Sequence, residues 1–152
     1  MRLTTYTDYA LRVLMHVALQ NGELVRISEI AANFGISHNH LTKVVHNLAV
    51  QGYLSTVQGR NGGIRLARTA EEITVGQVVR GFEPDLRLAE CFELKTSRCR
   101  IQPACLLRGV LGDAVAAFLH QLDQVTLLEL VRPRRNLQSL LGLPTVRPVA
   151  GL

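Results

Sequence analysis

The residues whose chemistry is easiest to identify are three cysteines, Cys91, Cys99 and Cys105, which lie close together while no other position holds one. An odd number of thiols cannot all pair within one chain. Residues 1–9 are polar and do not resemble a secretory signal, so we expect a cytoplasmic protein whose thiols stay reduced. Three reduced thiols in one polar, loop-like stretch indicate a metal centre or a redox device rather than three unreactive core cysteines.

The spacing of the cysteines favours an iron–sulfur cluster over structural zinc. Seven residues separate the first pair and five separate the second, whereas structural zinc sites favour pairs separated by roughly two to four residues. Iron–sulfur clusters take Cys thiolates, sometimes with one ligand of another type. Three thiolates leave one coordination position of the cluster without a cysteine ligand, which suits a centre that reacts with another molecule. Asp85, Glu90 and Glu93 are nearby candidates for a fourth ligand, and the spacing singles out none of them.

The first half of the chain predicts a winged helix. Apolar residues recur at helical spacing over 7–20, 27–34 and from Ser37 to just before Gly52. Gly35 ends the second of these helices, and two helices joined by a short turn with glycine form a helix-turn-helix. Residues 53–58 and 64–67 are rich in strand-forming residues on either side of a glycine-rich loop, which predicts a hairpin. Helix-turn-helix followed by a hairpin is the order of a winged helix.

The second half predicts further helices around the cysteines. A fourth helix begins at Thr74, where Gln77 has capping-box spacing, and ends near residues 81–84. Residues 84–103 show no clear period. A long amphipathic helix follows Pro103, and Thr126 can cap one more short helix before a loose basic tail from Arg132. The apolar stripe of the long helix comprises Leu107, Leu111, Ala114, Phe118 and Leu122.

Polar residues on the third helix and the hairpin tip predict a DNA-reading surface. In helix-turn-helix proteins the N-terminal part of the second helix of the motif enters the major groove. An ordinary solvated helix face would have a similar composition, so the helix alone does not distinguish it from a DNA-reading surface. The hairpin favours the DNA-reading surface. Its glycine-flanked tip carries Arg60, which suits a phosphate or the minor groove. The candidate contacts are Ser37, His38, Asn39, His40 and Lys43 on the helix, and Gln58, Arg60, Asn61 and Gly62 on the wing.

Composition narrows the class of function. Lys plus Arg number 17 against 12 Asp plus Glu, a net charge of +5 that fits a nucleic-acid partner. Trp is absent and other aromatic residues are few, which argues against stacking on single-stranded bases. No run of apolar residues is long enough for a transmembrane helix, so no membrane partner is expected. No nucleophile–base pair or substrate-pocket motif stands out, which argues against an enzyme, although a redox enzyme or a cluster carrier is the alternative from another class.

Three motifs together resemble the Rrf2 family of bacterial transcriptional regulators. They are LTxYTDYALR at residues 3–12, GRNGGIRL at residues 59–66, and Cys91, Cys99 and Pro-Ala-Cys ending at Cys105. The resemblance spans roughly residues 1–142. It implies a homodimeric repressor that binds a palindromic operator in double-stranded DNA, with an iron–sulfur cluster that controls DNA affinity.

Within this family the chain is most similar to the NsrR-like repressors that sense nitric oxide. In that group a carboxylate at the position of Asp8 completes a [4Fe–4S] cluster from the partner subunit, so [4Fe–4S] is preferred over [2Fe–2S]. The IscR-like group has a histidine where this chain has Arg108. From the residues alone, Asp8 is better explained as a charge that stabilises a helix N-terminus. An iron- or cluster-status sensor of the RirA or IscR type, or a cluster-free thiol sensor, are the alternatives.

The resemblance divides the chain into four parts. These are a winged helix-turn-helix domain at residues 1–83, a cluster-binding loop at 84–105, a dimerisation helix region at 106–131 and a C-terminal tail at 132–152.

Overall fold

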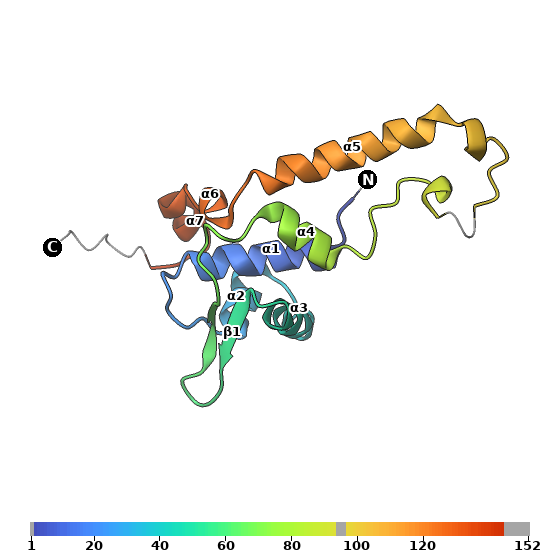
Figure 1. Ribbon diagram of the computed structural model, residues 1–152. Helices are drawn as coiled ribbons and strands as arrows, with labels where there is room; N and C mark the ends of the chain where they lie inside the picture. The colour runs from blue at the N-terminus through green and yellow to red at the C-terminus, as the bar shows by residue number, and fades with distance from the viewer. Residues whose placement is uncertain (1, 94–96, 145–152) are drawn as a thin grey trace.

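The computed structural model describes residues 2–93 and 97–144, and it has the expected architecture, a body of helices from which a small hairpin projects (Figure 1). Its two strands form one antiparallel sheet. The mainly helical fold class with a β-hairpin wing is thus confirmed. In chain order the elements are α1 (Thr5–Ala18), α2 (Ile27–Phe34), α3 (His38–Val50), β1 (Leu54–Val57), β2 (Gly63–Leu66), α4 (Val75–Phe82), η1 (Glu90–Phe92), η2 (Gln102–Ala104), α5 (Leu106–Asp123), α6 (Leu127–Leu130) and α7 (Arg134–Leu140).

The core is built on α1, which contacts α3, α4, α6 and β2. Thr4 caps the helix, because its hydroxyl accepts a hydrogen bond from the backbone N–H of Thr7. The apolar faces of α1 and α3 are buried against each other, and each buried Val or Leu contributes roughly 1.5–3 kcal/mol relative to an exposed one. The buried residues of these faces are Ala10, Val13, Leu14 and Val17 in α1, and Leu41, Val44, Val45 and Leu48 in α3.

A buried histidine links α1 to the helix-turn-helix. His16 is fully buried, and burial lowers its pKa to about 4. It is therefore neutral at neutral pH, and its Nε2 lies 2.9 Å from the amide nitrogen of Asn33 in α2. The turn that follows α2 has Gly35 at φ 62°, a left-handed conformation that glycine adopts without steric cost. Ser37 then stands at the N-cap of α3, and its side chain makes no capping hydrogen bond.

The hairpin is held in place by the segment before α2. Leu54 pairs with Leu66 and Val57 with Gly63 in antiparallel register. Ile64 also exchanges two backbone hydrogen bonds with Val25, at 2.9 and 2.8 Å. A Cβ at Gly63 would lie 2.8 Å from the carbonyl oxygen of Val25, so this close approach requires glycine. The wing is consequently fixed relative to the helices at its base.

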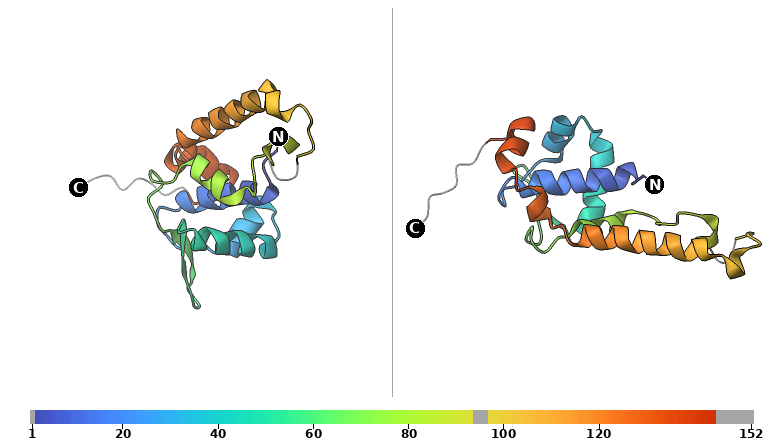
Figure 2. Two further views of the ribbon diagram at one scale, coloured as in Figure 1. Left: turned by 45° about the vertical axis from the view of Figure 1, so that its right-hand side comes forward. Right: turned by 90° about the horizontal axis from the view of Figure 1, so that it is seen from above.

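The long helix α5 extends past the body of the protein (Figures 1 and 2). Its C-terminal part lies beside α4, and its N-terminal part projects together with the cysteine loop. The stripe predicted from the sequence is split between two environments. Leu111, Phe118 and Leu122 are half-buried, whereas Leu107 is 60% exposed and Ala114 is exposed. No residue of α5 is fully buried.

The prediction of a loose tail from Arg132 is wrong for residues 132–144. These residues form α7 and return to the end of α1, where Leu19, Val131 and Leu143 make a second small core. A guanidinium nitrogen of Arg134 donates hydrogen bonds to the carbonyls of Ala18 and Leu19, at 3.3 and 2.7 Å. These carbonyls end α1 and need donors, so the arginine caps the helix from a distance. The remainder of the predicted tail lies outside the described residues.

Among the described residues, no helix combines the length and the apolar character that a membrane span requires.

Candidate functional site

The predicted recognition helix presents its polar side chains to solvent. His38, Asn39, His40 and Lys43 are all exposed, as is Ser37 at the N-cap. The opposite face of α3 is buried in the core. The N-terminal half of α3 therefore offers hydrogen-bonding side chains on a surface that the core holds in one orientation.

Two hydrogen bonds fix this helix further. The hydroxyl of Tyr6 in α1 donates to the carbonyl oxygen of Lys43 over 2.9 Å. Within α3, the hydroxyl of Thr42 donates to the carbonyl oxygen of His38 over 2.9 Å. The first bond ties the middle of the recognition helix to α1, so a displacement of α1 would move the reading surface.

The wing tip carries the other predicted contacts. Gln58, Arg60 and Asn61 are exposed, and Arg60 and Asn61 are the central residues of a turn in which the N–H of Gly62 donates to the carbonyl of Gly59 over 2.9 Å. Gly59 has φ 108°, and a Cβ at Gly62 would overlap the carbonyl of Val57. The tight turn thus depends on both glycines, and it holds Arg60 at the end of the hairpin. The wing and α3 lie on the side of the molecule opposite α5 (Figures 1 and 2).

Removing the wing arginine should weaken DNA binding. We expect Arg60→Ala to cost about 1–3 kcal/mol of operator binding energy if the side chain contacts a base. Arg135→Ala is the matched control, because it removes one exposed positive charge from α7 instead of the wing. Operator affinity measured at one fixed salt concentration checks this, and equal losses in the two variants would contradict a wing contact.

The three cysteines are free thiols in the segment between α4 and α5. Cys91 lies in η1, Cys99 follows the segment 94–96 that the structure does not describe, and Cys105 is the N-cap residue of α5. All three are half-buried. Within residues 2–93 and 97–144, no three His, Cys, Asp or Glu side chains lie together as a metal-binding group. The structure therefore places the cysteines in one projecting loop without bringing them together as a ligand set.

The donor atoms of this loop fit an iron–sulfur cluster. Thiolate sulfur is the ligand that such clusters take, and a half-buried thiol needs no rearrangement of a hydrophobic core to reach iron. The loop and its cysteines make no part of the main core.

The carboxylates near the cysteines already have partners. The side chain of Arg87 donates to Asp85 over 2.7 Å and holds the pKa of that carboxyl below its usual range. Arg87 also forms an ion pair with Glu93. Glu90 accepts a hydrogen bond from the backbone N–H of Arg98 over 2.9 Å. The three local candidates for a fourth ligand therefore bind groups of the loop itself.

Asp8 lies in the first turn of α1, apart from the cysteine loop. Its carboxylate forms an ion pair with Arg12, one turn later, at 2.8 Å, and its side chain is 45% exposed. It lines a surface hollow with Tyr9, Phe34 and Gly35. The guanidinium of Arg12 stands 5.8 Å from the centre of the Phe34 ring, at the end of α2. Asp8 is therefore open to another molecule and connected to the turn before the recognition helix.

Two ion pairs were not predicted from the sequence. The Asp8–Arg12 pair has a local signal, since opposite charges four residues apart meet on a helix. The ion pair between Arg80 and Asp123 joins positions too far apart in sequence for any such signal.

Comparisons with known proteins agree on one family. Residues 3–133 match the family model described as Rrf2, iron-dependent transcriptional regulator. The transcriptional regulator NsrR of Shouchella clausii is 48% identical over 95% of this chain and 98% of its own. NsrR of Bacillus subtilis is 46% identical, with 93% and 97% of the two chains covered.

Solved structures agree on the fold. IscR of T. potens has a TM-score of 0.70 with 22% identity, covering 91% of each chain. The oxidised form of Staphylococcus aureus CymR has a TM-score of 0.68 with 23% identity, covering 87% of this chain and 97% of its own. The curated relatives are regulators and not enzymes, as the sequence predicted. With its family match over most of its length and its similarity to the NsrR proteins, this chain belongs to the Rrf2 family of transcriptional regulators.

Proposed function

We propose that this protein is a homodimeric, cytoplasmic repressor that binds a palindromic operator and responds to nitric oxide through an iron–sulfur cluster. The observation that carries the proposal is the position of Cys105, which is both the third cysteine and the N-cap of α5. A change at the cysteines therefore acts directly on the helix that projects from the DNA-binding domain. The similarity to NsrR proteins over nearly the whole chain supports nitric oxide as the signal.

The exposed face of α5 supports a dimer. Its projecting half carries Leu106, Leu107 and Val110, which are 86%, 60% and 63% exposed. Ala114 and Ala117, also exposed, continue the same face of the helix. A monomer of this size rarely exposes so continuous an apolar surface, so we assign it to a second copy of the chain. Two copies related by a two-fold axis would present two recognition helices to a palindromic operator.

Cys91, Cys99 and Cys105 would hold the cluster, with Asp8 of the other subunit as the fourth ligand. When bound, the cluster supplies iron at which nitric oxide can react. Four protein ligands suit either cluster type, and the preference for [4Fe–4S] over [2Fe–2S] comes from the resemblance to the NsrR-like repressors. The half-exposed position of Asp8, beside a hollow of the surface, is compatible with the approach of a loop from the partner.

The chain itself offers a route from this ligand to the recognition helix. In the absence of a partner the carboxylate of Asp8 is bound by Arg12. Arg12 lies over Phe34, the last residue of α2, and Gly35 follows in the turn before α3. Taking Asp8 away from Arg12 would alter contacts at that turn, and so would alter the presentation of α3.

The proposal is tested by replacing the carboxylate. Asp8→Ala should keep a cluster, since three thiolates remain, but should change its visible spectrum and weaken the loss of operator affinity that nitric oxide causes. Asp8→Cys should react more slowly with nitric oxide, because a weak oxygen ligand is replaced by a thiolate.

Arg12→Ala is the matched control. It breaks the same ion pair and leaves the carboxylate, so the spectrum of the cluster should stay that of the parent. Anaerobic absorption spectra and operator binding before and after nitric oxide are the measurements. If Asp8→Ala equals the parent in spectrum, kinetics and affinity, Asp8 is only a charge at a helix end.

One alternative has a specific observation in its favour. The family model describes an iron-dependent regulator, which supports a sensor of iron or of cluster supply. The two kinds of sensor respond differently to nitric oxide and to the removal of iron. A nitric-oxide sensor loses operator affinity on brief anaerobic exposure to the gas at constant iron, whereas an iron sensor loses it when a chelator removes iron and responds little to the gas.

A further inference from the structure

Helix α4 contacts both the end of the predicted recognition helix α3 and the end of α5. A glycine of α4 lies at each of these two contacts. At its C-terminal end, the side chain of Gln51 from the end of α3 donates to the carbonyl of Gly81 over 3.0 Å. A Cβ at Gly81 would overlap that side chain. At its N-terminal end, a Cβ at Gly76 would overlap the carboxylate of Asp123, the last residue of α5. Glycine inside a helix normally destabilises it, so these positions indicate that close approach matters.

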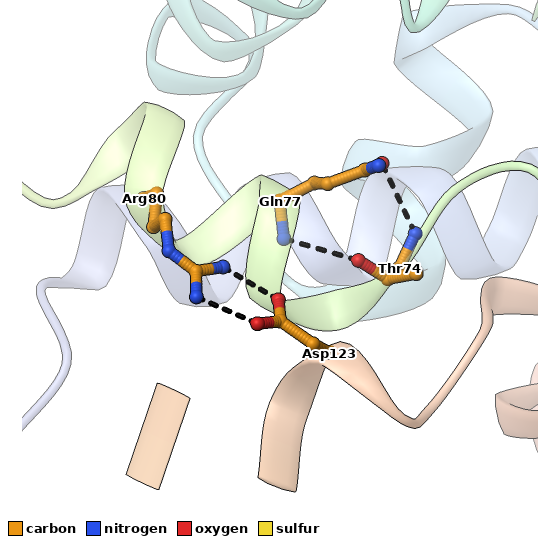
Figure 3. Close-up of polar contacts among 4 residues, drawn as sticks. All are labelled: Thr74, Gln77, Arg80 and Asp123. Carbon is orange, nitrogen blue, oxygen red and sulfur yellow. Dashed lines mark hydrogen bonds and ion pairs between the residues drawn. The ribbon is translucent and has the colours of Figure 1, made fainter. Parts of the chain in front are cut away.

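The contact with α5 is a two-point ion pair (Figure 3). The Nη1 and Nη2 atoms of Arg80 donate to the Oδ1 and Oδ2 atoms of Asp123 over 2.5 and 2.6 Å. These hydrogen bonds hold the pKa of Asp123 below its usual range, so the carboxylate stays ionised at neutral pH. A bidentate pair fixes the relative orientation of its partners as well as their distance.

Beside this pair, backbone hydrogen bonds join the same ends of the two helices. The N–H of Val75 donates to the carbonyl of Val125 over 2.9 Å, and the N–H of Leu127 donates to the carbonyl of Ile73 over 2.8 Å. These bonds hold one end of α5 in place, and the C-terminal part of α5 packs beside α4. The Arg80–Asp123 pair adds a contact with two hydrogen bonds, whose geometry fixes the orientation of the two helices where they meet.

We propose that Arg80 and Asp123, with Gly76 allowing their approach, set the angle at which α5 leaves the DNA-binding domain. The inference rests on the proposed dimer through α5. In that dimer the angle determines the distance between the two recognition helices. Arg80 and Asp123 are thus positioning residues that determine which half-site spacing the protein accepts, although neither lies on the DNA-reading face.

Stability alone does not account for such a pair. The side chains of Arg80 and Asp123 are 44% and 33% exposed, and ion pairs with this exposure add little to the free energy of unfolding. The pair joins α4 to α5 through side chains that are both partly exposed. Loss of the Arg80–Asp123 pair should therefore change the preference for one half-site spacing more than it changes the melting temperature.

The test uses the full-length protein and a palindrome that the parent selects from random DNA. Affinity is measured for that palindrome, for versions with one base pair added or removed between half-sites, and for a single half-site. We expect Arg80→Ala to lower the preference for the selected spacing by about fivefold or more, the size of a typical coupling between sites. Half-site affinity, melting temperature and dimer content should stay those of the parent.

Two further variants keep the test sharp. The charge-reversed pair, Arg80→Asp with Asp123→Arg, should restore the preference. Gly76→Ala should lower it in the parent but have little further effect in an Asp123→Ala background, where no carboxylate is left to displace. Arg132→Ala is the control, because its ion pair with Glu129 of α6 includes no residue of α5.

The outcomes separate this inference from the proposed function. A parent that is monomeric or has no spacing preference would overturn the proposed dimeric repressor, and this inference with it. A dimeric parent with a spacing preference that Arg80→Ala leaves unchanged would overturn the positioning role alone. So would a loss in Arg80→Ala that is equally large on the single half-site.

Discussion

Val110→Glu should convert the proposed dimer into monomers and reduce operator affinity by about two orders of magnitude or more. Val110 is 63% exposed on the projecting half of α5, next to Leu106, which is 86% exposed. A two-fold interface brings the same surface of both copies together, so one substitution places two carboxylates close to each other in an apolar contact. A monomer can occupy only one half-site, and it loses the gain in effective concentration that comes with the second. Sedimentation and operator binding at one salt concentration measure both effects.

Leu140→Glu is the control for this substitution. Leu140 is 83% exposed on α7, so the change puts the same charge on an equally exposed leucine outside α5. This variant should remain dimeric and bind the operator as the parent does. The opposite pattern, with Val110→Glu dimeric and Leu140→Glu monomeric, would show that the dimer interface lies on α7 and not on α5.

Cys99→Ala should abolish the cluster and leave a folded winged helix. The cysteines are half-buried in the loop and make no part of the main core, so the free energy of unfolding should change little. Losing one of three thiolates removes a ligand that no nearby carboxylate is free to replace, since Asp85, Glu90 and Glu93 bind other groups of the loop. Cys91→Ala and Cys105→Ala should behave in the same way.

The measurement is anaerobic native mass spectrometry with a melting curve for each variant. Ser97→Ala serves as the control, because the Ser97 hydroxyl accepts a hydrogen bond from the N–H of Cys99 over 3.4 Å and is no cluster ligand. It should retain the cluster. A Cys99→Ala protein that assembles a complete cluster would refute the three-thiolate site.

Much of the fold follows from local sequence because its signals are local. The Thr74–Gln77 capping box and the left-handed Gly35 depend on residues within one turn, and both occur where the pattern predicts them. The order of helix, turn, helix and hairpin then predicts a recognition surface, and the structure exposes its residues. The same holds for the basic wing tip, whose tight turn requires glycine at positions 59 and 62. The ligand set and DNA contacts built on these residues remain predictions.

Only the tertiary structure decided which parts of the chain meet. Apolar residues cover more than one face of α5, so periodicity could not tell that Leu111 is half-buried while Val110 is exposed. The arginines and prolines that follow Arg132 have the composition of an unstructured tail. The sequence does not reveal that carbonyl groups at the end of α1 accept hydrogen bonds from Arg134. The Arg80–Asp123 pair has no sequence signal at all. Local preferences act between neighbours in the chain, whereas these contacts depend on where α1, α4, α5 and α7 come together in space.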